Sequence, residues 1–507
     1  MEDSDFHRRA FEWKSAFPEI FAAGGFDIVI GHPPYVRMEL IKPFKPYLQT
    51  RYEVVADRAD LYAYFFELGV RLLKPGGRLG YISSSTFFRT GSGEALRRYL
   101  TDKAEIESVV DFGDRQIFEG VTTYPAIVTL RRGNGHSSDE NLRFLKANVP
   151  ADDLTKAFVK SSERMPRARL GAGSWRFESD RLDEIRKKMA AGRKTLSEVY
   201  GAPLYGIKTG LNEAFVVSRE TRDALTARDA RSADLLKPFL IGENLKRWHV
   251  ESDDLWLIYT PKNRIDIKHY PAVRDHLAPF RQALEKRATR QNWWELQQAQ
   301  AAYEPSFNLP KVIYPHFNDR PNYALDERNF YSNDKSYIIP TAANGLSAYL
   351  NAKPLWFFLA GLAPAVRGGF REARVRYVSQ LPVDVEHAEF ATLGKSVGRA
   401  SALRFEIIGN VVHRLADIGA PKNLVWDWAE MDFGAFRARL AKRFKIEIPV
   451  AERDAWERYF NARKAEVEAL SRRIADAESE INDRVYRLFA LDRDEIALIE
   501  EEIAGQY

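Results

Sequence analysis

The sequence predicts an α/β protein in three parts: a partial Rossmann-like sheet, a mixed α/β domain and a helical C-terminal region. Residues 1–160 alternate apolar, strand-like runs with amphipathic helices, which is typical of a doubly wound sheet. Residues 161–388 mix strand and helix signals, and residues 389–507 have helical periodicity. Because 507 residues are too many for one ordinary core, we expect separate domains with boundaries near 160 and 388.

The composition is that of a globular protein, with 45% apolar residues and no hydrophobic run long enough to span a bilayer. The N-terminus has no signal-peptide pattern and the chain has no cysteine, so we expect a cytoplasmic location. Without cysteine there are no disulfides, thiolate zinc sites or cysteine nucleophiles, and the nine histidines lack metal-ligand spacing. Lys and Arg number 76 against 71 acidic residues, a surplus that permits a polyanionic partner without requiring one.

The first predicted strand, over 26–30, ends abruptly. It is followed by Gly31, His32, two prolines at 33 and 34, and Tyr35. Prolines cannot continue a sheet, so the chain turns here and presents an aromatic ring. One interpretation is an ordinary Pro-Pro turn. The other is a ligand site, because ligands of doubly wound sheets bind at the carboxyl ends of strands.

The next elements follow in order. Residues 36–60 are polar and basic and are expected to form a loop or short helices. A helix is predicted over 60–74, with Asp60 as its N-cap. Its apolar face would comprise Leu61, Tyr64, Phe65, Leu68 and Leu72. Strands are then predicted over 78–83, 106–112 and 124–131, a helix over 93–101, and a hairpin loop over 133–140.

A series of motifs in this order resembles the adenine-specific DNA methyltransferases. Its order and spacing are most similar to the single-chain type IIG restriction-modification enzymes with a TaqI-like specificity domain. The motifs span 26–35, 59–62, 72–77, 112–114, 117–120, 205–212, 236–242 and 485–488. The resemblance therefore extends from the first strand almost to the end of the chain.

The resemblance implies roles for five residues around the first strand. The family has an Asn-Pro-Pro-Tyr motif where this chain has His32, Pro33, Pro34 and Tyr35. The Pro33 carbonyl would accept a hydrogen of the adenine amine, and Tyr35 would stack on the base after it leaves the duplex. Phe118 would close the other face of the base, although an aromatic residue at such a position is as often an ordinary core residue. The implied methyl donor is S-adenosylmethionine.

His32 departs from the family, which has a compact oxygen acceptor at this position. A neutral imidazole offers one nitrogen acceptor, and a protonated imidazole offers none. We therefore expect methyl transfer to adenine to be weakened or absent in this chain.

The family's glycine-rich cofactor loop and acidic ribose-binding residue lie upstream of the catalytic motif. The 31 residues before His32 contain neither. The strand at 26–30 would then be a bare apolar edge, which invites pairing with another strand. We infer that a second polypeptide supplies the first strands and completes the S-adenosylmethionine site, or that the chain is a fragment of a longer enzyme.

The middle region places basic residues beside aromatic ones, where the family has its target-recognition domain. Such clusters suit phosphates and base edges, so double-stranded DNA is the expected partner. For any single cluster, a buried aromatic core with a solvated basic rim is the more common arrangement. The candidate DNA-binding residues are Lys208, Lys246, Arg247, Trp248, Arg371, Arg374 and Arg376.

The C-terminal region is expected to pack rather than to catalyse. Apolar residues advance by three or four from Val467 to Leu488, which predicts a long amphipathic helix.

Two functions remain open. One is an adenine-N6 DNA methyltransferase of a restriction-modification or phage-defence system that needs a partner. The other is a catalytically impaired subunit that only recognises DNA. A Rossmann-like enzyme of small molecules would leave the basic and aromatic region unexplained.

Overall fold

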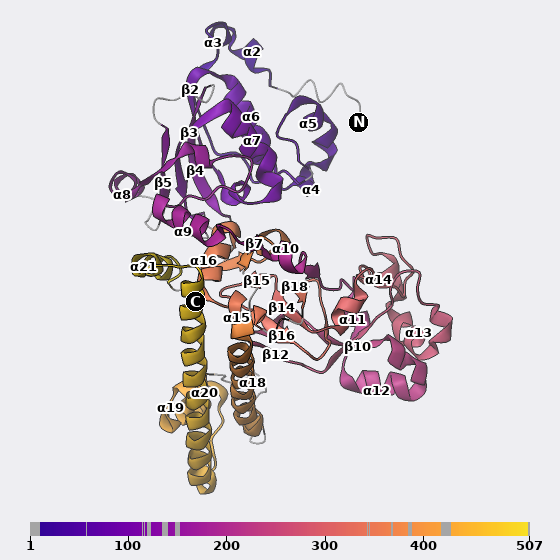
Figure 1. Cartoon of the computed structure of the whole chain (residues 1–507). Coiled ribbons are helices and arrows are strands. Elements are labelled where there is room, and N and C mark those ends of the chain that lie inside the picture. Colours follow the sequence, from indigo (N-terminus) through magenta and orange to yellow (C-terminus); the bar gives the residue numbers. More distant parts are fainter. Residues whose placement is uncertain are drawn as a thin grey trace. The chain divides into compact units, whose positions relative to one another are not determined.

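The computed structural model describes residues 11–504, except 57, 114, 116, 119–122, 134–139, 148–152, 342, 344, 367–368, 384–387 and 417–426. Residues 134–139 of the predicted loop at 133–140 and parts of the motifs at 112–120 therefore lie outside the described residues. The chain divides into two compact units, Met1–Lys187 with Ala360–Glu372, and Lys188–Leu359 with Ala373–Tyr507 (Figure 1). The domain boundaries near 160 and 388 stay predictions.

The first unit is built on a six-stranded sheet among its described residues, in the order β1-β2-β4-β3-β5-β6. Strand β1 is parallel to β2, whereas β4 lies between β2 and β3 and is antiparallel to both. This mixed topology confirms the predicted partial Rossmann-like sheet. The strands are β1 (Phe26–Gly31), β2 (Leu73–Ser84), β3 (Ala104–Asp111), β4 (Pro125–Arg132), β5 (Asn141–Lys146) and β6 (Glu163–Pro166).

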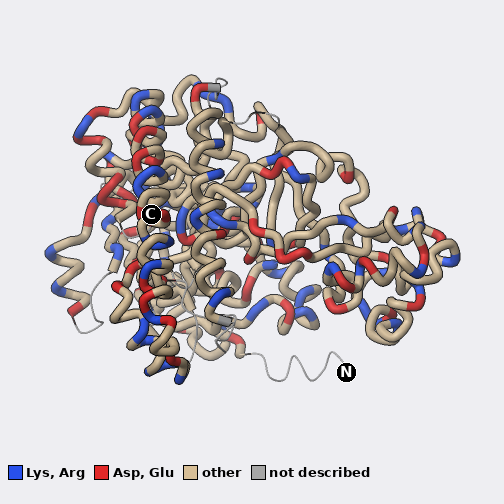
Figure 2. The backbone as a smooth tube through the Cα atoms, turned by 90° about the horizontal axis from the view of Figure 1, so that it is seen from below, with Lys and Arg blue, Asp and Glu red and all other residues tan. Residues whose placement is uncertain are grey.

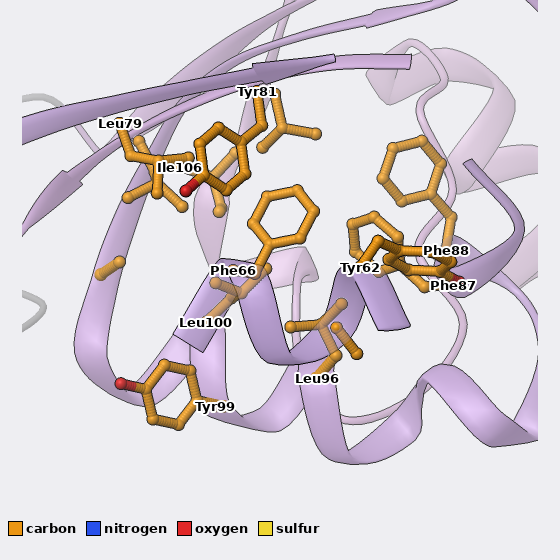
Figure 3. Close-up of a cluster of buried hydrophobic side chains, with 14 of the residues drawn as sticks. Tyr62, Phe66, Leu79, Tyr81, Phe87, Phe88, Leu96, Tyr99, Leu100 and Ile106 are labelled. Carbon is orange, nitrogen blue, oxygen red and sulfur yellow. The ribbon is translucent and has the colours of Figure 1, made fainter. Parts of the chain in front are cut away.

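Helices α6 (Leu61–Leu72) and α7 (Glu94–Lys103) enclose the core of this unit (Figure 3). Phe66 lies at its centre, with ring centroids 5.2 Å from Tyr81 and 5.5 Å from Phe87. The predicted apolar face of α6 is wrong at Phe65, which is 36% exposed. A second side of the helix is also buried. On that side the Glu67 carboxylate accepts hydrogen bonds from the backbone amides of residues 53 and 54.

Strand β1 begins after a glycine that no other residue could replace without strain. Gly25 has φ of +123°, and a Cβ atom there would lie 2.6 Å from the Leu72 carbonyl oxygen. Among the described residues β1 pairs only with β2, so its other edge is free. The side chains of Ile28 and Ile30 on this strand are 62% and 81% exposed.

The second unit contains two four-stranded sheets among its described residues, in the orders β17-β10-β13-β9 and β16-β14-β18-β8. The first comprises β9 (Val216–Val217), β10 (Leu236–Leu240), β13 (Leu255–Ile258) and β17 (Tyr331–Ser332). The second comprises β8 (Leu204–Tyr205), β14 (Lys311–Pro315), β16 (Ala324–Asp326) and β18 (Ser336–Pro340). Together with helices such as α12 (Arg219–Arg228) and α13 (Pro271–Leu277), they confirm the predicted mixed α/β domain.

The C-terminal region is helical, as predicted. Helix α18 (Ala388–Ala416) packs against α20 (Arg453–Leu488), and α19 (Phe433–Arg439) joins them through a core that includes Trp428 and Phe460. The short helix α21 (Arg493–Glu502) follows. No helix among the described residues has the length and apolar character needed to cross a membrane.

Candidate base pocket and nucleic-acid interface

Three rings meet at the carboxyl end of β1. His32 follows the last residue of the strand, and its ring centroid lies 5.4 Å from that of Tyr35 in an edge-on arrangement. The ring of Phe118, from the loop after β3, stacks on His32 at 5.1 Å and 20°. The structure thus brings together three residues that the sequence singled out, although Phe118 lies 86 positions after His32.

Gly31 sets the approach of this turn to the sheet, because a Cβ atom there would lie 3.0 Å from the Tyr81 ring. Pro33 is buried, whereas His32 and Pro34 are exposed. The Tyr35 ring is half-buried, and its hydroxyl has no hydrogen-bond partner among the described residues. Burial raises the pKa of Tyr35 to about 12, so the phenol is neutral at physiological pH.

The segment after Tyr35 is fastened to the start of α6. The Met38 amide donates to Asp60 Oδ1 at 3.3 Å, and the Leu61 amide donates to the Val36 carbonyl at 3.0 Å. Asp60 occupies the N-cap position of α6, but its side chain makes no capping bond to that helix. Its carboxylate binds the turn instead, and burial raises its pKa. The motif at 59–62 therefore positions the residues that follow the Pro-Pro turn.

The candidate DNA-binding residues lie in different environments. Lys208 and Arg376 are exposed, and Arg376 stacks on Tyr377 at 5.2 Å. Arg371 and Arg374 are partly buried. Lys246 lies over the Phe405 ring at 5.6 Å.

Arg247 and Trp248 contact the C-terminal helix α20. Both donate to the Glu478 carboxylate, from Arg247 Nε at 2.9 Å and from Trp248 Nε1 at 2.5 Å. Arg247 also donates to the carbonyls of Pro321 and Asn351, and Trp248 is buried. These contacts hold α20 against the sheet domain within the second unit.

Sequence reasoning left three exposed residues out of the candidate set: Tyr205, Phe317 and Lys335. Tyr205 pairs in register with Tyr337 on β18, and Lys335 accepts a hydrogen bond from the amide of His316, the neighbour of Phe317. The sequence signals were the motif at 205–212 for Tyr205 and the basic and aromatic composition of 314–320 for Phe317, whereas their arrangement depends on strand pairing. Among the residues that the structure describes, no group of three His, Asp or Glu side chains could hold a metal ion.

Comparison with known protein families gives matches to both regions. Residues 2–118 match the Eco57I restriction-modification methylase family, and residues 237–383 match the TaqI-like C-terminal specificity domain. Residues 386–485 match a domain of unknown function. One segment of the chain is thus similar to restriction-modification methylases and another to TaqI-like specificity domains. This finding confirms the resemblance to type IIG restriction-modification methyltransferases.

Individual relatives agree with the family matches. The chain is 25% identical to the type II methyltransferase M.PaeR7I of Pseudomonas aeruginosa over 390 residues, which cover 71% of this chain and 65% of the relative. It is 27% identical over 199 residues to the restriction enzyme and methyltransferase RM.Eco57I of Escherichia coli, covering 38% of this chain and 19% of the relative. The chain thus spans just under two thirds of the length of M.PaeR7I.

Solved structures agree with the fold. The type IIL restriction-modification enzyme MmeI, solved in complex with DNA, matches with a TM-score of 0.53 and 12% identity. The match covers 94% of this chain and 56% of that one.

Proposed function

We propose that this chain provides the base pocket and the target recognition of a sequence-specific adenine-N6 DNA methyltransferase. The observation that carries the proposal is the convergence of the Tyr35 and Phe118 rings on residue 32 at the carboxyl end of β1. The match of residues 237–383 to a specificity domain supports DNA as the substrate. The system would be one of restriction-modification or phage defence.

The pocket residues would hold a base that has left the duplex. Tyr35 and Phe118 offer ring faces for stacking, and the neutral Tyr35 phenol adds no charge beside the base. The Pro33 carbonyl would accept one hydrogen of the exocyclic amine and so orient its nitrogen. S-adenosylmethionine, when bound, supplies the methyl group.

A second candidate, a catalytically impaired recognition subunit, is favoured by one observation. The His32 ring itself stacks on Phe118, where a flipped base would otherwise stack. An imidazole also offers fewer acceptor positions than the family's Asn. His32 therefore weakens methyl transfer twice, by competing for the Phe118 face and by lacking an amide oxygen.

The free edge of β1 supports completion of the sheet by a second polypeptide. Unpaired strand edges with exposed apolar side chains are ready to pair with another strand, and Ile28 and Ile30 provide such side chains. The described residues next to β1 contain no glycine-rich loop that could cradle a cofactor. The cofactor contacts would then lie on the strands that pair with this edge.

The test measures methyl transfer to duplex DNA from labelled S-adenosylmethionine, using the full chain with the polypeptides that copurify with it. Tyr35→Ala should lower transfer at least about tenfold, because a base-stacking ring is lost. Phe65→Ala, which removes an exposed ring on α6, should leave it unchanged. Label on cytosine rather than on adenine N6, or equal transfer by Tyr35→Ala and parent, would contradict the proposal.

A further inference from the structure

The second unit has an aromatic plate where β14 ends at Pro315. The rings of His316 and Phe317 are stacked, with centroids 4.4 Å apart and an angle of only 4° between them. Phe317 is 45% exposed, so the outer face of this pair is available to a flat ligand.

The inner ring of the plate is held rigidly. The His316 amide donates to the Lys335 carbonyl at 2.9 Å, and the His316 carbonyl accepts from the Ala373 amide at 2.8 Å. The Tyr337 ring packs edge-on against His316 at 5.6 Å. A plate fixed in this way loses little conformational entropy when a ligand stacks on it.

The plate has polar atoms that are buried without a partner. Nε2 of His316 and Oδ1 of Asn318 have no hydrogen-bond partner among the described residues. Asn318 is only 4% exposed, and its amide nitrogen donates to the Pro315 carbonyl at 2.8 Å. Burial, together with the charges of Arg374 and Lys335, lowers the pKa of His316 to about 4. His316 is therefore an uncharged ring at neutral pH.

Further exposed side chains lie on or close in sequence to the paired strands of this sheet. Tyr205 on β8 is 47% exposed, and it pairs in register with Tyr337 on β18. Lys335 comes directly before β18, and Lys208 follows Tyr205 by three residues. Acidic residues are also present: Asp334 lies 3.8 Å from Lys335, and Asp319 lies 3.6 Å from Arg320. At these distances the ion pairs are loose and exposed, so both cations can exchange partners cheaply.

We propose that the stacked pair of His316 and Phe317 is a base-stacking plate of the specificity domain, and that Lys335 and Lys208 bind phosphates beside it. Aromatic faces among mobile cations suit nucleic acid, because every base has a flat face and every nucleotide a charge. Protein interfaces are depleted in lysine, whereas Lys335 lies beside this pair of rings. This inference rests on the proposed function, since it assumes that the specificity domain binds DNA.

The first test measures the affinity of the full chain for duplexes that the parent protein selects from a random-sequence library. Loss of one base-stacking ring is worth 1–3 kcal/mol, so Phe317→Ala should weaken binding by about 5-fold to 150-fold. Phe317→Trp should retain binding, because it keeps a flat ring. Leu309→Ala is the matched control: Leu309 is 51% exposed and lies two residues before β14, and its loss should leave affinity unchanged.

The second test uses salt dependence. Removing one phosphate contact lowers the slope of log affinity against log salt by about one, without altering sequence preference. Lys335→Gln should show this change, and the exposed Lys442→Gln in the C-terminal region should not. Thermal unfolding of every variant verifies that the fold is kept.

The outcomes separate this inference from the proposed function. If the parent chain selects no DNA, the proposed function fails and the plate fails with it. If the parent binds but Phe317→Ala binds equally well, only the plate is overturned. If Phe317→Ala keeps DNA affinity and loses a copurifying polypeptide, the plate is a protein interface, which also overturns the inference.

Discussion

His32 is the residue on which the chemistry of the candidate pocket depends. Its ring contacts those of Tyr35 and Phe118, and in the proposed pocket residue 32 would supply the acceptor for a base held by the other two rings. An Asn side chain at this position would present a carbonyl oxygen and would leave the Phe118 face open. Three rings thus cluster at the carboxyl end of β1, and the proposed pocket offers no amide oxygen at residue 32.

At the same scale, His316 should make stability depend on pH. Its pKa is lowered by burial from 6.5 to about 4, so the folded state favours the neutral ring. The stabilisation is present above pH 6.5 and is lost as the pH falls towards 4, because the unfolded chain takes up a proton first. The difference in free energy of unfolding between the parent and His316→Gln should therefore fall from pH 7 to pH 4. Denaturant titrations at several pH values measure it, and a constant difference would contradict the assigned environment.

At the scale of elements, the edge position of β1 among the described strands supports the proposed second polypeptide. Ile30 is 81% exposed at the end of a strand that leads directly into the candidate pocket. Ile30→Lys should keep the thermal stability of the chain, since little buried area is lost, and should reduce both self-association and copurification of a second polypeptide. Light scattering and pull-down assays measure these effects. Phe65→Ala is the control and should associate like the parent. If Ile30→Lys also associates like the parent, this edge is not an interface.

Elements with strong local signals could be predicted from the sequence. The strand at 26–30 was predictable because an apolar run ends at two prolines, and α20 because its apolar residues keep a helical period. The buried face of α6 was not, because contacts with residues 53 and 54 add a second buried side. The buried ion pair of Lys311 with Asp326, 2.7 Å apart, had no local signal either. The plate at His316 and Phe317 depends on the pairing of β14 with β18, which local patterns do not encode.

At the scale of the whole molecule, the proposed functions fall on different parts of the chain. The first unit holds the ring cluster, and most of the segment that matches a specificity domain lies in the second unit. Charge alone singles out no DNA-binding surface, because basic and acidic residues are interspersed along the chain (Figure 2). Recognition of DNA must therefore come from particular side chains. A basic cluster in the sequence can also stabilise packing, as the hydrogen bonds of Arg247 and Trp248 to Glu478 show.

The most direct test of the central claim compares methyl transfer to adenine by the parent and by His32→Asn, each with its copurifying polypeptides. The claim is that Tyr35, Phe118 and residue 32 form the base pocket of a DNA methyltransferase. It predicts that His32→Asn transfers at least about tenfold faster than the parent, because an amide acceptor replaces the imidazole. Equal rates for the two proteins, or no transfer by His32→Asn, would contradict it.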